Sequence, residues 1–426
     1  MELLDIVSIL LTLAAVFGYL NLKTIKLPTT IGIMLFSVAF SLIILCLKPL
    51  FPEVVQESKA LLNSIDFNNT LMNGMLSYLL FAGALHVNLN DLKQQKILVA
   101  ILASFGVVFS TFAIGGVTYY LFSLLDIKAS LLWCLLFGAL ISPTDPVAVL
   151  GVLKKAGAPK SLETKITGES LFNDGVGVVV YLVLLGMLGS GLHDHGSGHH
   201  EETMSALSIA KLFIVEAGGG ILWGLLLGGL GFYTLKNINN YQIEILISLA
   251  LVTAGYRSAM ALHLSGPLAM VVAGLMLGNQ GRSLAMSNST REHLDTFWEL
   301  IDEILNAVLF LLIGLELLIL EWSKPAIIFA CLAIPLTLII RYIAVSIPVL
   351  ALRKVKTFSP QVIKILTWGG LRGGISIALA LGLPKSLEYT DARNTILVAT
   401  YFVVIFSIAV QGLSLSKLIE NSLKKG

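Results

Sequence analysis

The chain carries very little charge for its length. Asp, Glu, Lys and Arg make up only 13% of its 426 residues, whereas soluble domains carry about a quarter. Hydrophobic residues reach 56%, and mean hydropathy is +0.88. Uncharged runs such as residues 97–125 exceed the roughly 20 residues that cross a bilayer core as a helix. The sequence therefore predicts a polytopic α-helical protein in a lipid bilayer, with no nucleic acid partner, and excludes a β-barrel, whose signal is short alternating strands.

Cysteine is also scarce. Cys46, Cys134 and Cys331 all fall in apolar segments, where a free cysteine behaves as a small hydrophobic residue, so no disulfide framework is expected. Glu2 and Asp5 precede the first span, with no basic leader or cleavage site, and we expect that span to remain in the mature protein. Because the loops are short, no soluble domain and no cofactor are expected, and function must reside among the helices.

The hydropathy pattern predicts thirteen transmembrane helices. Their centres lie near residues 12, 37, 79, 110, 142, 177, 220, 251, 271, 309, 337, 372 and 405. An odd number puts the termini on opposite sides. With a cytoplasmic C-terminus, the inside loops hold 18 Lys and Arg and the outside loops hold 8, which fits the positive-inside rule. We therefore expect a cell (inner) membrane protein with its N-terminus outside and its C-terminus in the cytoplasm.

Two of these spans are interrupted at mid-length. Residues 142–146 read Ser-Pro-Thr-Asp-Pro and residues 369–374 read Gly-Gly-Leu-Arg-Gly-Gly. Proline removes a backbone donor and clashes with the preceding turn, and glycine weakens a helix interior by about 1 kcal/mol relative to alanine. Broken backbone at membrane depth is tolerated only where it contacts protein or lines a cavity. Paired broken helices, one in each half of the chain, indicate a transporter with its binding site near the bilayer midplane.

The sixth span opens with a polar face ahead of the uncharged run 175–192. At about 100° per residue, Glu169, Ser170, Asn173 and Asp174 occupy one arc of roughly 140°. Two carboxylates, a hydroxyl and an amide are hard oxygen ligands that suit a small cation. An ionisable group within a membrane span marks an ion or proton pathway by default. The alternative is a polar helix end in a cytoplasmic loop.

Further ionisable residues flank the two breaks. Thr144 can offer a hydroxyl or a freed carbonyl to a cation. Asp145 can neutralise the positive end of a half-helix, which contributes up to about 2 kcal/mol. The alternative for Asp145 is a plain helix cap, a role that differs little from this electrostatic one. Arg341 and Arg372 both need a partner, since a buried unpaired guanidinium costs several kcal/mol. We pair Arg341 with Glu169. Asp174 is then left unpaired and free to exchange a proton near neutral pH.

The insert at residues 193–202, His-Asp-His-Gly-Ser-Gly-His-His-Glu-Glu, has a composition that can bind metal. Its interleaved Gly and Ser favour a mobile solvated loop instead. We assign it no transport role.

Five segments together resemble the monovalent cation:proton antiporter-1 family, which includes the bacterial NhaP antiporters and the animal sodium/proton exchangers. They are residues 142–150, 168–174, 263–269, 310–314 and 369–374. The resemblance implies an NhaA/NhaP-like fold, in which inverted repeats supply two crossed discontinuous helices. It also implies a homodimer, with an ion-transporting core at about 70–190 and 295–418 and a dimerisation part at about 1–50 and 205–285.

The resemblance further implies a site that takes sodium and proton by turns. Asp174 would carry the ion, Thr144 and Ser170 would be co-ligands, and Asn173 would mark the Asn-Asp subgroup. Glu169 with Arg341 looks like the family's structural ion pair, and Asp145 and Arg372 look like its broken-helix charges. One departure is Ala82, near which some NhaP proteins carry a Glu; nearby His86 either substitutes for it or is a satisfied interfacial histidine, which we favour.

These features predict an antiporter rather than an enzyme. If Na+ (or Li+) and H+ compete for Asp174, exchange is one for one and electroneutral, with alternating access. A K+/H+ antiporter is an alternative. A channel is disfavoured because the sequence has no filter loop or ring of like residues. An intramembrane aspartyl protease, built from Asp145 and Asp174 sharing a proton, is disfavoured by the cation-like ligands and the nearby arginine.

Overall fold

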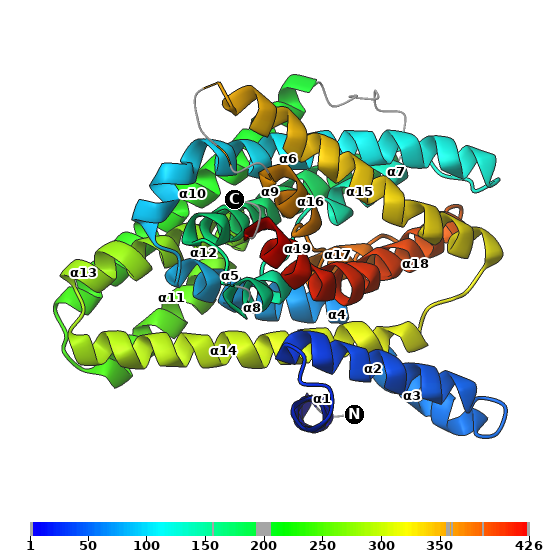
Figure 1. The fold of residues 1–426 in the computed structure, drawn as a ribbon, viewed down its shortest axis with the longest axis horizontal. Coiled ribbons are helices and arrows are strands. Elements are labelled where there is room, and N and C mark those ends of the chain that lie inside the picture. Colours follow the sequence, from blue (N-terminus) through cyan, green and yellow to red (C-terminus); the bar gives the residue numbers. More distant parts are fainter. Residues whose placement is uncertain are drawn as a thin grey trace.

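The computed structural model describes residues 3–155, 157–192, 206–354, 358, 361–385 and 387–423. In these residues all regular secondary structure is helical, and there is no strand (Figure 1). The histidine-rich insert lies outside these residues. The elements are α1 (Leu3–Lys23), α2 (Thr29–Cys46), α3 (Pro52–Ser64), α4 (Phe67–Asn69), η1 (Thr70–Met75), α5 (Leu76–Leu85), α6 (Leu89–Leu124), α7 (Leu131–Ile141), α8 (Val147–Lys155), α9 (Lys160–Leu192), α10 (Ala206–Lys236), α11 (Tyr241–Ala261), α12 (Gly266–Met276), η2 (Leu277–Gly281), α13 (Arg282–Leu284), α14 (Asn288–Leu315), η3 (Glu316–Leu318), α15 (Lys324–Leu352), α16 (Val362–Trp368), α17 (Gly374–Leu381), α18 (Thr390–Phe406), η4 (Ser407–Gly412) and α19 (Leu413–Leu423).

The predicted all-helical architecture is confirmed. Eleven of the thirteen expected span centres fall in helices, and the other two, 142 and 372, fall in the breaks between α7 and α8 and between α16 and α17. By length and apolarity, 8 helices of the described part are able to cross a membrane. The remaining expected spans are broken, contain a π-helical turn or, in α14, carry charge along half their length. The number of crossings stays a prediction.

Between α2 and α5 the chain forms an additional helix, α3, which is not among the thirteen expected spans. Pro52 sits in its first turn, where the missing amide donor is not needed. Val55 and Leu62 are buried and belong to the main hydrophobic cluster. The segment is amphipathic, so it lies on the ends of the membrane helices instead of looping into solvent.

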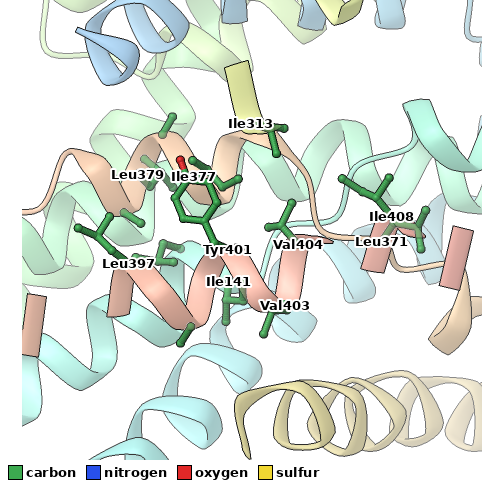
Figure 2. Packing of buried hydrophobic residues seen from close by; sticks show 14 of the residues in the cluster. Ile141, Ile313, Leu371, Ile377, Leu379, Leu397, Tyr401, Val403, Val404 and Ile408 are labelled. Atoms are coloured by element: carbon green, nitrogen blue, oxygen red, sulfur yellow. The ribbon is translucent and has the colours of Figure 1, made fainter. Parts of the chain in front are cut away.

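The halves of the interrupted segments are held by helix α18. Figure 2 shows Tyr401 of α18 against Ile377 and Leu379 of α17, within a buried cluster that also includes Ile141 at the end of α7. Tyr181 of α9 donates a hydrogen bond of 2.8 Å to the carbonyl oxygen of Leu379. These contacts fix both broken segments against unbroken helices, which is necessary because each half is too short to be stable alone.

Helices α6 and α7 approach each other closely at Gly138. A Cβ atom there would meet the carbonyl group of Thr111 on α6. A close-packed interior cannot accommodate an added methyl group unless the backbone moves. Gly116, also on α6, has open space around its Cβ position and is exposed.

We therefore expect Gly138→Ala to lower stability by about 1–3 kcal/mol through overpacking. Gly116→Ala, the matched control, should be neutral or stabilising because alanine favours the helix by about 1 kcal/mol. Thermal unfolding of the purified protein in detergent distinguishes the two. Equal melting temperatures for both variants would contradict the close packing.

Candidate ion-binding site

The two interrupted segments meet at their breaks. Helix α7 ends at Ile141 and α8 begins at Val147, while α16 ends at Trp368 and α17 begins at Gly374. The backbone amide of Asp145 donates a hydrogen bond of 2.8 Å to the carbonyl oxygen of Leu371. The extended backbone of one break thus satisfies a polar group of the other, as burial requires.

At each break, a charged side chain also compensates the partial charge of the helix ends. The Arg372 guanidinium donates to the carbonyl oxygens of Ser142 and Pro143, the latter at 2.9 Å, and so lies at the negative end of α7. The Asp145 Oδ1 atom accepts from the amide of Val147 at 2.8 Å, and its Oδ2 atom lies where a Cβ of Gly373 would be. The carboxylate therefore faces the positive starts of α8 and α17, the favourable arrangement for helix dipoles.

Thr144 is held by two residues of α9. The Asn173 amide donates to Thr144 Oγ1 at 2.8 Å and accepts from the Thr144 backbone amide at 3.2 Å. The hydroxyls of Thr144 and Ser170 share a hydrogen bond of 2.9 Å. All three side chains are buried. Because both polar atoms of the Asn173 amide bind Thr144, Asn173 acts on the site by positioning the break.

Glu169 and Arg341 form the predicted ion pair. Both are buried, and Arg341 also donates to the carbonyl oxygen of Leu366 at 3.1 Å. The guanidinium lies against Gly370, where a side chain would collide with it. The pair thereby joins α9, α15 and the second broken segment.

Asp174 lies next to this network without joining it. Its carboxylate is 6% exposed and has neither a hydrogen bond nor an ion pair to any residue within the described ranges. It sits near the middle of a continuous helix that begins fourteen residues earlier at Lys160. The alternative of a solvated helix end in a loop is therefore wrong for Glu169, Ser170, Asn173 and Asp174.

A cavity of about 1550 Å³ reaches this position. Its lining includes Thr144, Asp145 and Asp174, together with residues from the loops around Lys26, Asn88, Lys160 and Ser283. All four loops are on the side that the sequence predicts to be cytoplasmic. The cavity therefore joins Asp174 and Thr144 to the side that the sequence predicts to be cytoplasmic.

The region near Ala82 adds no carboxylate to the cavity. Ala82 lines it, and His86, at the C-terminal end of α5, pairs through Nδ1 with the Ala82 carbonyl oxygen at 2.8 Å. His86 is hydrogen-bonded to its own helix and also lines the cavity, so both interpretations of its role stay predictions.

Sequence reasoning missed several polar lining residues. Among them are Glu299, Asp302, Glu303 and Asn306 of α14 and Ser376 of α17. The spacing of 299, 302 and 306 along one face of a half-apolar helix was the available signal.

Glu169→Ala should destabilise the protein by about 3–5 kcal/mol, because it leaves the Arg341 charge buried and unpaired. The double substitution E169L/R341M should regain most of that loss, since it removes both charges. Thermal unfolding in detergent measures both variants, with Glu163→Ala on the same helix as the control. An E169A variant of normal stability would refute the structural role of the pair.

Comparison with known proteins agrees with this geometry. A family model described as "Sodium/hydrogen exchanger, transmembrane" matches residues 10–421. The Na(+)/H(+) antiporter NhaP of Pseudomonas aeruginosa is 48% identical over 424 residues, which are 98% of this chain and 97% of that protein. The Na(+)/H(+) antiporter NhaH of Halobacillus dabanensis is 34% identical over 422 residues, 97% of each chain. The solved structure of the sodium proton antiporter MjNhaP1 from Methanocaldococcus jannaschii has a TM-score of 0.73 at 18% identity and covers 98% of this chain and 99% of that one, which confirms the predicted fold. The chain belongs to the family of transmembrane sodium/hydrogen exchangers.

Proposed function

We propose that the protein is a secondary antiporter that exchanges Na+ for H+ across the cell membrane and so contributes to sodium and pH homeostasis. One observation carries the proposal: Asp174 is a buried carboxylate without a protein partner in the part of the chain described, at the inner end of a cavity and beside two crossed broken helices. The family membership and the names of the relatives support the same activity.

Asp174 is the shared carrier of cation and proton in this proposal. Its oxygens are hard ligands for Na+, and the hydroxyl oxygens of Thr144 and Ser170 are the nearest neutral oxygens on the two elements that meet there. Asn173 holds Thr144 in position. Since one carboxylate cannot bind Na+ and H+ together, each Na+ that binds displaces one proton.

This competition makes exchange electroneutral. One positive charge moves in each direction, so the membrane-potential term of about 2.3 kcal/mol per charge per 100 mV cancels. Asp174 is neutralised when it holds either ion and is anionic when empty. The empty carrier crosses less easily, because a bare charge at membrane depth is costly, and this difference prevents leak.

Alternating access requires one part of the protein to move against another. We assign residues of about 70–190 and 295–418 to the moving ion-transporting core and about 1–50 and 205–285 to a dimerisation part of a homodimer. The broken helices keep their partners throughout the movement. Asp145 and Arg372 neutralise the helix ends at the breaks, and the Glu169–Arg341 pair stays intact.

The N-terminus is outside and the C-terminus cytoplasmic. Na+ and Li+ are the preferred cations in this proposal, and neither K+ exchange nor proteolysis is favoured by the relatives.

Asp174→Asn should abolish Na+-dependent proton movement, because the amide cannot exchange a proton. The measurement is the fluorescence of a pH-sensitive dye in proteoliposomes after addition of NaCl. Asp391→Asn, an acid in the first turn of α18, is the matched control and should keep full activity. Retained exchange in D174N protein of normal stability would overturn the assignment.

Competition also predicts the effect of pH on kinetics. Lowering the pH on the side from which Na+ enters should raise the apparent KM for Na+ about tenfold per pH unit once protonated Asp174 predominates, with no change in maximum rate at saturating Na+. Initial rates over a matrix of Na+ concentration and pH measure this. A maximum rate that falls at low pH while KM stays constant would show that proton and cation use separate sites.

A further inference from the structure

One wall of the cavity is a polar stripe on α14. Glu299, Asp302, Glu303 and Asn306 all line it, and their spacing of three or four residues puts them on one helix face. Glu299 and Glu303 are exposed, Asp302 is half-buried, and Asn306 is 2% exposed. A Cβ on Gly374, at the start of α17, would contact Leu309, the next turn of α14. The stripe therefore runs from the cavity mouth toward the crossing of the broken helices.

The carboxylates of this stripe are not used in ion pairs. The basic residues that line the cavity are Lys26, Lys93, Lys160, Arg282 and Arg291. Two of them are already paired, Lys160 with Asp91 at 3.4 Å and Arg282 with Asp295. Over the described ranges, no basic group pairs with Asp302 or with its neighbours Glu299 and Glu303.

One buried hydroxyl beside the stripe lacks a partner. It is Oγ of Ser376 on α17, a residue that is 1% exposed and lines the cavity. Proteins rarely leave such an oxygen unsatisfied, so it indicates a ligand in the cavity at this depth. Asn306 also lines the cavity and lies one turn beyond Asp302, where its amide can donate to the carboxylate and orient it.

We propose that Asp302 is a second cation-handling carboxylate, a relay that takes partly dehydrated Na+ from the cytoplasmic funnel and transfers it to Asp174. Ser376 supplies a neutral oxygen ligand and Asn306 positions the carboxylate. The inference rests on the proposed Na+/H+ exchange and extends it by a residue on α14. Because the relay precedes binding at Asp174, it affects how Na+ is captured and leaves the competition with H+ unchanged.

The test is Asp302→Asn in proteoliposomes, with Glu303→Gln as the matched control. Glu303 has the same charge, lies on the same face and lines the same cavity, but it is exposed. Asp302→Asn should raise the KM for Na+ at the cytoplasmic face about tenfold, the equivalent of about 1.4 kcal/mol, with the same kcat and an unchanged KM at the outer face. Glu303→Gln should change KM less than about twofold, since water and salt screen an exposed charge.

A second variant, Ser376→Ala, removes the ligand oxygen without removing charge. It should raise the same KM about threefold and leave kcat unchanged, as expected for loss of one hydrogen-bond-strength contact. Asp302→Glu should restore the KM, which a merely structural role would not predict.

Three results would overturn the relay: an unchanged cytoplasmic KM in D302N, an equal rise in E303Q, or a fall of kcat at constant KM. The first leaves Asp302 without a role, the second shows a diffuse negative field, and the third places Asp302 in a later step. Failure of the proposed function looks different, because then the unsubstituted protein shows no Na+-dependent proton flux. If the D302N variant does not fold, the cytoplasmic KM of the S376A variant for Na+ tests the relay in its place, and an unchanged KM would overturn it.

Discussion

The crossing of two broken helices is the interaction on which the rest of the structure depends. Breaking a helix at membrane depth exposes carbonyl and amide groups that lipid cannot satisfy. Here the guanidinium of Arg372 takes the carbonyls at the end of α7, the Asp145 carboxylate faces the starts of α8 and α17, and the Asp145 amide reaches Leu371. Each break is completed by the other, so neither is stable alone.

This arrangement explains why the ionisable residues divide into two groups. Asp145, Arg372, Glu169 and Arg341 have partners within the protein and hold the crossing together. Asp174 has none among the residues described, although it is buried beside them. In the proposed mechanism, an ion neutralises the charge that the protein itself does not, and this couples the site to Na+ and H+. The proposal therefore gives the paired charges a structural role and leaves the unpaired one for transport.

Much of this site could be predicted from the sequence, because its signals are local. The proline and glycine clusters at 142–146 and 369–374 mark breaks by their effect on helix geometry, and the arc of polar residues from Glu169 to Asp174 follows from helical period alone. The pairing of Arg341 with Glu169 followed from the small number of intramembrane acids. The fold came from the order of motifs that the family shares.

The rest depends on tertiary contacts that no local pattern contains. The contact between Asn173 and Thr144 could not be predicted without knowing that α9 meets the first break, where the Asn173 amide oxygen accepts a hydrogen bond from the Thr144 backbone. The role of α14 was hidden because acids at the start of a span resemble an ordinary solvated end, and only the cavity shows that Asp302 faces inward. Helix α3 is not among the expected spans because it is only 13 residues long and has few apolar residues, so hydropathy alone does not reveal it.

The central claim is that one carboxylate holds either Na+ or H+, so that one ion exchanges for one proton. The most direct measurement is the zero-flux condition in proteoliposomes, where a pH gradient is imposed against a fixed Na+ gradient while the voltage is clamped with potassium and valinomycin. The account predicts that flux vanishes when the Na+ and H+ concentration ratios are equal, at every clamped voltage. A zero-flux point that moves with voltage would show unequal stoichiometry and contradict a single shared site.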